Sequence, residues 1–273
     1  MEYDLRKCIE KLGEKEKKIL KEFQNKIENW EAPSKEWEEE KKRHCTELTA
    51  YRFIFGYEWK IEEAETALKK CIDWRVSYKP QDVKYEECKL VAEQGFLYQV
   101  GYDKHGHPLV WIEVAKHKLE NTEEVKASMF RLLVYIVEKE LNNAPEHVHR
   151  LAWMIELKDA SLSIAIVKSL KDLFYNLGEY YPERMARAVV LNASWWMNAI
   201  WAFAKQFMTK TTIEKYKFIK GSSANVRKEL SGFIDPEKNL STYSTYGDLE
   251  WKYDYEEEVK KDHERQKEAQ QEE

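Results

Sequence analysis

From residue 95 onward, short apolar runs typical of buried strands alternate with longer segments of helical periodicity. The stretch GFLYQVGYDKHGHPLVWIEV, residues 95–114, indicates two strands around a glycine-containing turn, and so predicts a hairpin. Further strands are predicted at 150–157, 187–193 and 216–221, and helices at 122–141, 163–180 and 195–208. Because strands and helices alternate, the sequence predicts an α/β fold with an open, mostly parallel sheet.

The N-terminal third lacks this alternation and is rich in charge, with apolar residues at helical spacing, as at Ile19, Phe23 and Ile27. The segment after Trp251 is highly charged and nearly devoid of aliphatic side chains, which predicts a solvated helix or a disordered tail. We therefore expect three parts: a helical domain over 1–92, an α/β domain over 93–250 and a charged tail over 251–273.

The overall charge and the cysteines narrow the class of protein. A formal net charge of -5 over 273 residues argues against a uniformly basic nucleic-acid surface, so we expect no nucleic-acid partner. Four scattered cysteines form no CxxC pair and no disulfide framework, which favours reduced thiols. The first residues contain no apolar signal-peptide core. We therefore expect a cytoplasmic protein.

The segment NASWWMNAIWAFAKQFM, residues 192–208, is unusually apolar for a soluble acidic chain. The uncharged run 188–204 is at the short end of the roughly 17–25 residues that span a bilayer, and Asn192, Ser194 and Asn198 interrupt it. On a helical wheel its apolar arc covers about half the circumference or more, beyond what a helix on a sheet needs. Two interpretations stay open: a helix buried on two sides, or one that closes over an apolar cavity and touches a membrane.

Signatures of catalysis and metal binding are missing from the sequence. It contains no P-loop, no G-x-S-x-G, no G-x-G-x-x-G and no HExxH, so we name no catalytic residue and expect no cofactor beyond a bound ligand. The pairs His105-x-His107 and His147-x-His149 lie in predicted turns without cysteine or acidic ligands at suitable spacing. We interpret them as loop histidines and expect no metal site and no enzyme.

Four stretches, taken in their order and spacing, resemble the CRAL-TRIO lipid-binding family and in particular its phosphatidylinositol-transfer branch. The resemblance covers most of 46–247. Its stretches are TAYRFIFGYEWKIEEAETALKKCIDWR, YDKHGHPLVWIEV, IELKDASL and YYPERMARAVVLNASWWMNAIWAFAKQFMTKTTIEKYKFI. The resemblance implies that the sheet is the floor of an apolar lipid pocket in the part over 93–250, and that a gate helix over 196–208 covers it.

The resemblance also implies the residues of the site. The headgroup of an inositol phospholipid would contact Glu183, Thr212 and Lys215, where the lysine supplies a cation for phosphate, the threonine a hydroxyl, and the glutamate an acceptor for inositol hydroxyls. The pocket and gate would be formed by Trp111, Trp153, Ile155, Val190, Trp196, Ile200, Trp201, Phe203, Phe207 and Met208.

The implied function is that of a lipid transfer or sensing protein. It would take up one phospholipid, with phosphatidylinositol preferred, and exchange it through transient contact with membranes such as those of the Golgi or endosomes. Leu151 and Trp153 stand where the phosphatidylcholine-binding pattern has small hydroxyl residues, which disfavours that lipid. One alternative is a scaffold for a protein partner such as a small GTPase or its regulator, with Trp111 and Trp153 filling the pocket. The other is a sterol or isoprenoid carrier, favoured by two arginines missing after Arg52.

Overall fold

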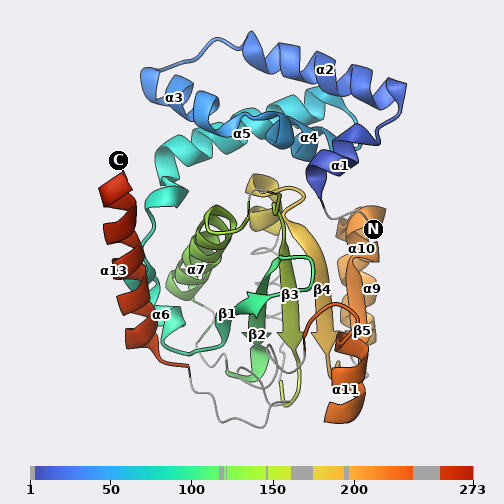
Figure 1. The fold of residues 1–273 in the computed structure, drawn as a ribbon, viewed down its shortest axis with the longest axis vertical. Helices are drawn as coiled ribbons and strands as arrows, with labels where there is room; N and C mark the ends of the chain where they lie inside the picture. Colours follow the sequence, from blue (N-terminus) through green and yellow to red (C-terminus); the bar gives the residue numbers. More distant parts are fainter. Residues whose placement is uncertain are drawn as a thin grey trace.

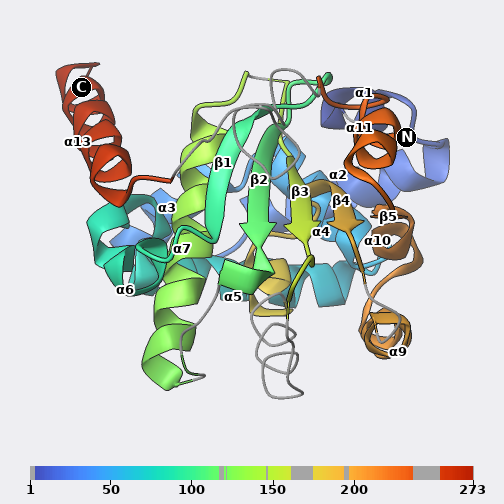
Figure 2. The same ribbon diagram turned by 90° about the horizontal axis from the view of Figure 1, so that it is seen from below.

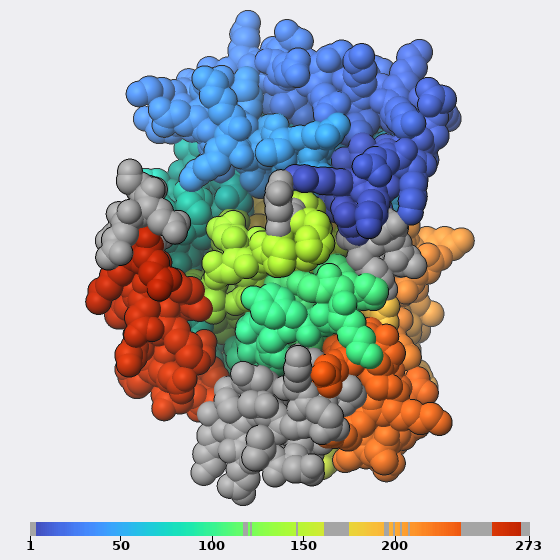
Figure 3. All heavy atoms as spheres, in the orientation of Figure 1, coloured from blue at the N-terminus to red at the C-terminus, as the bar shows by residue number. Residues whose placement is uncertain are grey.

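The N-terminal part is a bundle of helices around its own apolar core. The structure, a computed structural model, describes residues 4–116, 120, 122–145, 147–160, 175–193, 197–235 and 253–272. The bundle consists of α1 (Leu5–Glu10), α2 (Glu14–Glu28), α3 (Lys35–His44), α4 (Glu47–Gly56) and α5 (Ile61–Tyr78). In Figures 1 and 3 these helices, in blue, lie directly on one end of the α/β domain.

Polar side chains set the ends of the bundle helices. Ser34 caps α3, because its Oγ accepts a hydrogen bond from the backbone N–H of Trp37 at 3.2 Å. Thr46 caps α4 in the same way through the N–H of Thr49 at 3.3 Å. Helix α5 stops before Pro80, at a residue in the left-handed region (φ 53°).

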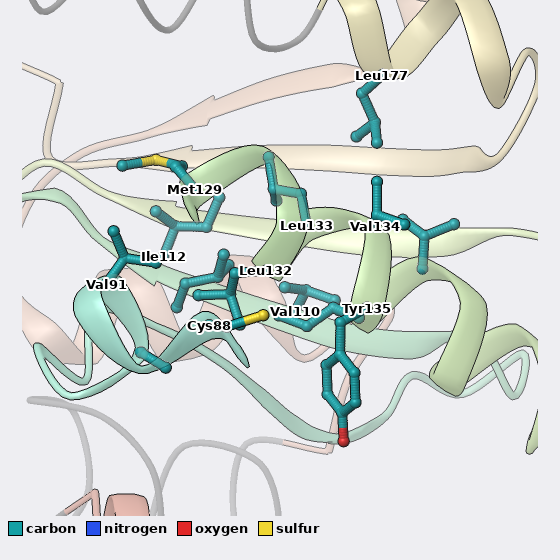
Figure 4. Packing of buried hydrophobic residues seen from close by; sticks show 14 of the residues in the cluster. Cys88, Val91, Val110, Ile112, Met129, Leu132, Leu133, Val134, Tyr135 and Leu177 are labelled. Atoms are coloured by element: carbon teal, nitrogen blue, oxygen red, sulfur yellow. The ribbon is translucent and has the colours of Figure 1, made fainter. Parts of the chain in front are cut away.

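The short elements that follow α5 belong to the core of the α/β domain. They are the 3-10 helices η1 (Pro80–Asp82) and η2 (Tyr85–Cys88) and the helix α6 (Lys89–Ala92). Their buried side chains Tyr85, Cys88 and Val91 pack against the long helix α7 (Glu123–Asn142) and the sheet, as Figure 4 shows for several of them. The core of the N-terminal bundle therefore ends with α5.

The sheet is open and mostly parallel, as predicted. Its strands are β1 (Leu97–Tyr102), β2 (Pro108–Glu113), β3 (Leu151–Glu156), β4 (Met185–Leu191) and β5 (Tyr216–Ile219), in the spatial order β1-β2-β3-β4-β5. The predicted hairpin is confirmed, since β1 and β2 pair antiparallel, while β2 to β5 are parallel neighbours. The predicted α/β fold with a mostly parallel open sheet is thus confirmed.

Two of the described helices that connect parallel strands pack on one face of this sheet, as expected where parallel strands follow one another in one direction through right-handed crossovers. Helix α7 packs there on β2 and β3, and α9 (Met197–Ala204) packs there through Met197. In Figure 2, α7 lies on the β1 side and α9 on the β5 side of the sheet. The other face is covered by α11 (Ser223–Leu230), whose Val226 and Leu230 pack on the sheet. We refer to these as the α7 face and the α11 face.

The apolar segment at 188–204 is divided between β4 and α9, so it begins as a strand. The helix predicted over 195–208 is α9 followed by the 3-10 turn η4 (Lys205–Phe207), and α10 (Lys210–Glu214) comes next. Most of the helix predicted over 163–180 lies outside the described residues, although 175–180 is helical. Within the described chain, the helices are too short or too polar to cross a bilayer.

The charged tail forms a helix, α13 (Tyr255–Glu272), and the helix is docked on the protein. Asp262 is buried, and its carboxylate accepts hydrogen bonds from the backbone N–H of Tyr85 at 3.1 Å and from the hydroxyl of Tyr135 at 2.7 Å. Arg265 donates to the same hydroxyl at 3.1 Å. The prediction of a solvated helix is therefore correct for one side of α13 only, because the buried carboxylate of Asp262 anchors the other side to the protein.

Candidate functional site

Three buried charged side chains meet at the amino ends of adjacent parallel strands. Arg150 immediately precedes β3, Glu183 lies two residues before β4, and Lys215 immediately precedes β5. Glu183 Oε2 accepts from Arg150 Nη2 at 2.8 Å and from Lys215 Nζ at 2.8 Å. Arg150 Nε also donates to the backbone carbonyl of Glu183 at 3.1 Å. We call Arg150, Glu183 and Lys215 the strand-end cluster.

The strand-end cluster is shielded from solvent by the N-terminal bundle. The side chains of Arg150, Glu183 and Lys215 are 4%, 6% and 4% exposed. Burial lowers the pKa of the Lys215 ammonium, and the charge of Glu183 opposes this shift. Burial raises the pKa of Tyr51 in α4, on which the neighbouring Cys8 of α1 and the charges of Arg150 and Glu183 also act. Tyr51 and Cys8 therefore lie over the cluster.

Two of the three predicted headgroup residues are thus in direct contact, and the third is close in sequence. Thr212 lies in α10, and its hydroxyl contacts that of Thr209, the cap of this helix, at 2.9 Å. Its backbone carbonyl accepts from the N–H of Lys215 at 3.1 Å. The structure therefore places Thr212 one helical turn from the strand-end cluster, with its hydroxyl directed to the first turn of α10.

Beside the strand-end cluster, the α7 face of the sheet presents two apolar rows. Residues aligned across parallel strands share a face. The pairing register aligns Trp153, Ala188 and Tyr216 in one row, and Ile155, Val190 and Phe218 in the other. Trp153, Ala188 and Val190 are buried, whereas Phe218 is 36% exposed at the edge of the sheet. We call these six residues the apolar rows.

Helix α9 lies over the β5 end of the apolar rows. The indole of Trp201 packs on the rings of Tyr216 and Phe218, with centroid distances of 4.7 and 5.0 Å. Met197, in the first turn of α9, packs against the buried cluster of Leu157, Val190 and Ala193. The predicted gate segment therefore contacts the predicted floor.

The other predicted gate residues are only partly described. Ile200 and Met208 are half-buried. Trp196 lies outside the described residues, and the side chains of Phe203 and Phe207 are also not described.

The two tryptophans predicted to fill the pocket lie on opposite faces of the sheet. Trp111 pairs with Met154, so it lies on the α11 face and packs in the core with Val226 and Leu230. Trp153, one residue before Met154, lies on the α7 face. A single cavity cannot be filled by both indoles, which removes the sequence feature that favoured the scaffold interpretation.

A second charged group, which no sequence motif indicates, lies between the N-terminal bundle and the α/β domain. Arg75 of α5 donates to Glu40 at 2.6 Å and to Glu138 of α7 at 2.7 Å. Arg52 of α4 donates to the carbonyl of Pro182 at 3.3 Å, and Arg184 to that of His149 at 2.9 Å. We call Arg52, Arg75, Glu138 and Arg184 the charged seam.

Burial shifts the pKa of two basic groups at the charged seam. It lowers the pKa of Arg184 to about 10 and that of the adjacent His149 to about 4, where the positive charge of Arg184 adds to the shift. His149, considered as a loop histidine, thus packs at this seam. His107, in the turn of the hairpin, is structural. The carboxylate of Asp103 lies 2.8 Å from its ring Nδ1 and also accepts a hydrogen bond from its backbone N–H.

For Arg150, the sequence signal of a site residue was a basic side chain directly before a buried strand. For Arg184 the signal was its place beside Glu183 in the P-E-R motif. Neither position shows from sequence alone that its side chain is buried, since each contact joins residues more than 30 positions apart.

Comparison with known proteins shows which family this chain is similar to. Residues 92–244 match the family model described as the CRAL/TRIO domain. The chain is 27% identical to Patellin-6 of Arabidopsis thaliana over 68% of this chain and 47% of Patellin-6. It is 29% identical to the SEC14 cytosolic factor of Eremothecium gossypii over 72% of this chain and 68% of that protein. The phosphatidylinositol transfer protein CSR1 of the same organism is 23% identical over 86% of this chain and 57% of its own length.

The chain spans about half the length of Patellin-6 and of CSR1. Among solved structures, the crystal structure of Sfh5 is similar with a TM-score of 0.55 and 16% identity, covering 66% of each chain. That likeness supports the fold. The family model covers more than half of the 273 residues, including β1 to β5 and the strand-end cluster. The chain therefore belongs to the CRAL-TRIO family.

Proposed function

We propose that the protein binds one phospholipid, preferably phosphatidylinositol, and exchanges it between membranes. The observation that carries this proposal is the direct contact of Lys215 with Glu183 at 2.8 Å, at the amino ends of the strands that bear the apolar rows. A charged group next to an apolar surface matches the two ends of a phospholipid.

The strand-end cluster has the chemistry of an inositol phosphate site. The ammonium of Lys215 is a cation for the phosphate, and the Glu183 carboxylate can accept from hydroxyl groups. Both side chains are nearly fully buried, so their interactions with a ligand are weakly screened by water. A headgroup that offers both a phosphate and several hydroxyls satisfies both residues, whereas choline offers neither a hydroxyl nor a donor for Glu183.

The apolar rows supply a surface for acyl chains. Each methylene group of an acyl chain that is buried there contributes about 0.8 kcal/mol. Contact over a few tens of Å² on each acyl chain therefore already favours its transfer from water. Trp201 of α9 contacts Tyr216 and Phe218 only at the β5 end of the rows. Displacement of α9 from these two rings would expose the end of the rows to a membrane, which supports α9 as the gate.

The relatives support the same proposal. One of them carries the name phosphatidylinositol transfer protein, and its similarity extends over 86% of this chain. At 23% identity, the similarity leaves the choice of lipid to the residues of the site.

Mass spectrometry of the lipids that copurify with the protein tests the proposal. The organic extract is analysed, and the intact complex is weighed under native conditions. We expect phosphatidylinositol at one molecule per chain. A sterol, or a phospholipid without inositol, in its place would contradict the headgroup assignment, and a protein that takes up no lipid from vesicles would contradict lipid transfer itself.

A double substitution tests the headgroup residues. We expect Lys215→Ala with Thr212→Asp to abolish phosphatidylinositol transfer between vesicles, because it removes the phosphate cation and adds a repelling carboxylate. The matched control is Lys210→Ala with Thr211→Asp, which makes the same chemical changes at two exposed positions of the same helix. Unchanged transfer in the first variant, with both variants folded, would contradict the assignment.

A further inference from the structure

The headgroup residue Glu183 lies in a tight turn that faces the N-terminal bundle. The turn comprises residues 181–184 and leads into β4, and the backbone N–H of Arg184 donates to the carbonyl of Tyr181 at 3.4 Å. In Figure 1, β3 and β4 run away from the bundle, so their amino ends face it. The conformation of this turn determines where the carboxylate of Glu183 points.

The backbone of this turn has a conformation that glycine usually adopts. Pro182, the second residue, has its φ fixed at about −65° by its ring, whereas Glu183, the third residue, has a φ of 58°. A positive φ at the third residue distinguishes a type II turn from a type I turn, and the two types differ by a rotation of the peptide group between these residues. Because a residue with a side chain favours the type I conformation, the Pro182–Glu183 peptide group requires a contact that keeps its orientation.

Arg52 of α4 supplies such a contact. Its Nη1 donates at 3.3 Å to the carbonyl oxygen of Pro182, which is the oxygen that would swing away if the peptide group rotated. Its Nη2 donates to Thr49 Oγ1, one turn earlier in the same helix, at 2.9 Å. Arg52 is only 1% exposed, so water does not compete for these hydrogen bonds. A hydrogen bond from a charged donor in such surroundings is among the stronger ones in a protein.

The next two carbonyl groups of the turn are held from β3 and the residue before it. The carbonyl of Glu183 accepts from Arg150 Nε at 3.1 Å, and that of Arg184 accepts from the backbone N–H of Leu151 at 2.8 Å. Both contacts fix peptide groups that follow Glu183, and neither acts on the peptide group before it. Among the contacts of the described residues, the orientation of that peptide group therefore depends on Arg52.

The bundle also contacts the residues that lead into the turn. Lys70 Nζ of α5 donates to the carboxylate of Glu179 at 2.6 Å. The indole of Trp74, also in α5, stacks on the ring of Tyr180 with a centroid distance of 4.1 Å and an angle of 11° between the planes. The bundle and the turn thus form one packed unit, in which the reach of Arg52 is fixed by contacts beyond its own.

We propose that Arg52 is a positioning residue of the headgroup site, because its guanidinium holds the peptide group before Glu183 and so keeps the Glu183 carboxylate beside Lys215. The proposal rests on the proposed function and deepens it, since it makes the N-terminal bundle part of the lipid site. Rotation of the peptide group would turn the Cα–Cβ bond of Glu183 to a new direction. The carboxylate would then separate from Lys215, which stays at the start of β5.

A double-mutant cycle on lipid loading tests this coupling. Wild type, Arg52→Met, Glu183→Gln and the double variant are incubated with phosphatidylcholine vesicles that contain phosphatidylinositol, and the bound phosphatidylinositol is measured by mass spectrometry. We expect Arg52→Met to lower phosphatidylinositol loading about 10-fold when Glu183 is present, and less than about twofold in the Glu183→Gln background. A merely structural role of Arg52 would lower loading by the same factor in both backgrounds.

Further variants separate positioning from folding. Methionine keeps the approximate volume of Arg52 and removes a buried charge, so we expect Arg52→Met to stay folded, which urea unfolding checks. Arg52→Lys keeps a donor that can reach the Pro182 carbonyl, so it should recover part of the loading. The control Lys60→Met removes an exposed cation of the bundle, paired with Glu63 at 3.2 Å, and should load as wild type does.

The conformation of the turn is tested without lipid. Crystal structures of lipid-free wild type and Arg52→Met give the φ of Glu183 directly, and we expect it to be positive in wild type and negative in the variant. A positive φ in the variant, or an equal loss of loading in both backgrounds, would overturn the positioning role of Arg52. Wild type that loads no phosphatidylinositol would contradict the proposed function instead, and the comparison of the two turns would still test Arg52.

Discussion

Glu138 is the only described carboxylate that joins helix α7 to both Arg75 and Tyr181, and its neutralisation is the sharpest test of the charged seam. It accepts from Arg75 Nη1 at 2.7 Å and Nη2 at 3.4 Å, and from the Tyr181 hydroxyl at 2.6 Å. Although burial by itself raises the pKa of Glu138, the hydrogen bonds from these two partners bring it below its ordinary value. Glu138→Gln keeps the shape of the side chain and removes its charge.

The expected loss of stability in Glu138→Gln follows from the contacts that remain after the substitution. The side chains of Arg75 and Glu138 are 7% and 14% exposed, so solvent screens their interaction weakly. Removing one partner of a buried pair costs roughly 3–5 kcal/mol, because the other charge stays buried. Arg75 still contacts Glu40, and a glutamine oxygen still accepts one bond. We therefore expect a loss near the lower end, about 3 kcal/mol of the free energy of unfolding.

Urea unfolding followed by tryptophan fluorescence measures this loss. The control is Glu123→Gln at the start of the same helix, whose pair with Lys126 has side chains 91% and 39% exposed. We expect that variant to lose less than about 1 kcal/mol. Equal losses in the two variants would refute the reasoning that burial gives the Glu138 contact its weight.

Two further changes probe other buried groups. The unfolded chain protonates His149 near its ordinary pKa of 6.5, whereas the folded chain does so only near 4, so the free energy of unfolding should fall as the pH drops from 6.5 towards 4. Because this histidine is half-exposed, we expect screening to limit the loss to roughly 1 kcal/mol, and a His149→Gln variant measured by urea unfolding should lack that part of the pH dependence. Asp262→Ala removes the acceptor of Tyr85 and Tyr135, and should cost about 1–3 kcal/mol and expose 255–272 to hydrogen exchange before the rest of the chain. Unchanged exchange in α13 would show that Asp262 does not anchor it.

The fold was predictable because its signals are local. Alternating strand and helix periods indicated the parallel sheet, and the glycine-containing turn at 102–107 indicated the hairpin. Ser34 and Thr122 cap the helices that follow them, and such caps can be read from sequence because each acts within three or four residues.

The contacts of the site could be predicted only in part, because they join distant residues. Glu183 and Lys215 come from motifs that resemble the family, and the structure brings them together. Arg150 belongs to no such motif, and its contact with Glu183 follows only from the alignment of β3 beside β4. In the tail, Asp262 is one acid among many, and nothing local distinguishes the one that is buried.

The strand order has a consequence for the shape of the ligand. In open α/β sheets, compact ligands such as nucleotides bind in a crevice at the carboxyl edge, where the direction of winding reverses. The described strands run from β1 to β5 without such a reversal, so no crevice of this kind opens at their carboxyl edge. The strands instead form an elongated surface that is polar at their amino ends and apolar beyond them. For the proposed phospholipid ligand, such a surface suits a long amphiphile lying flat along the strands better than a compact molecule held at an edge.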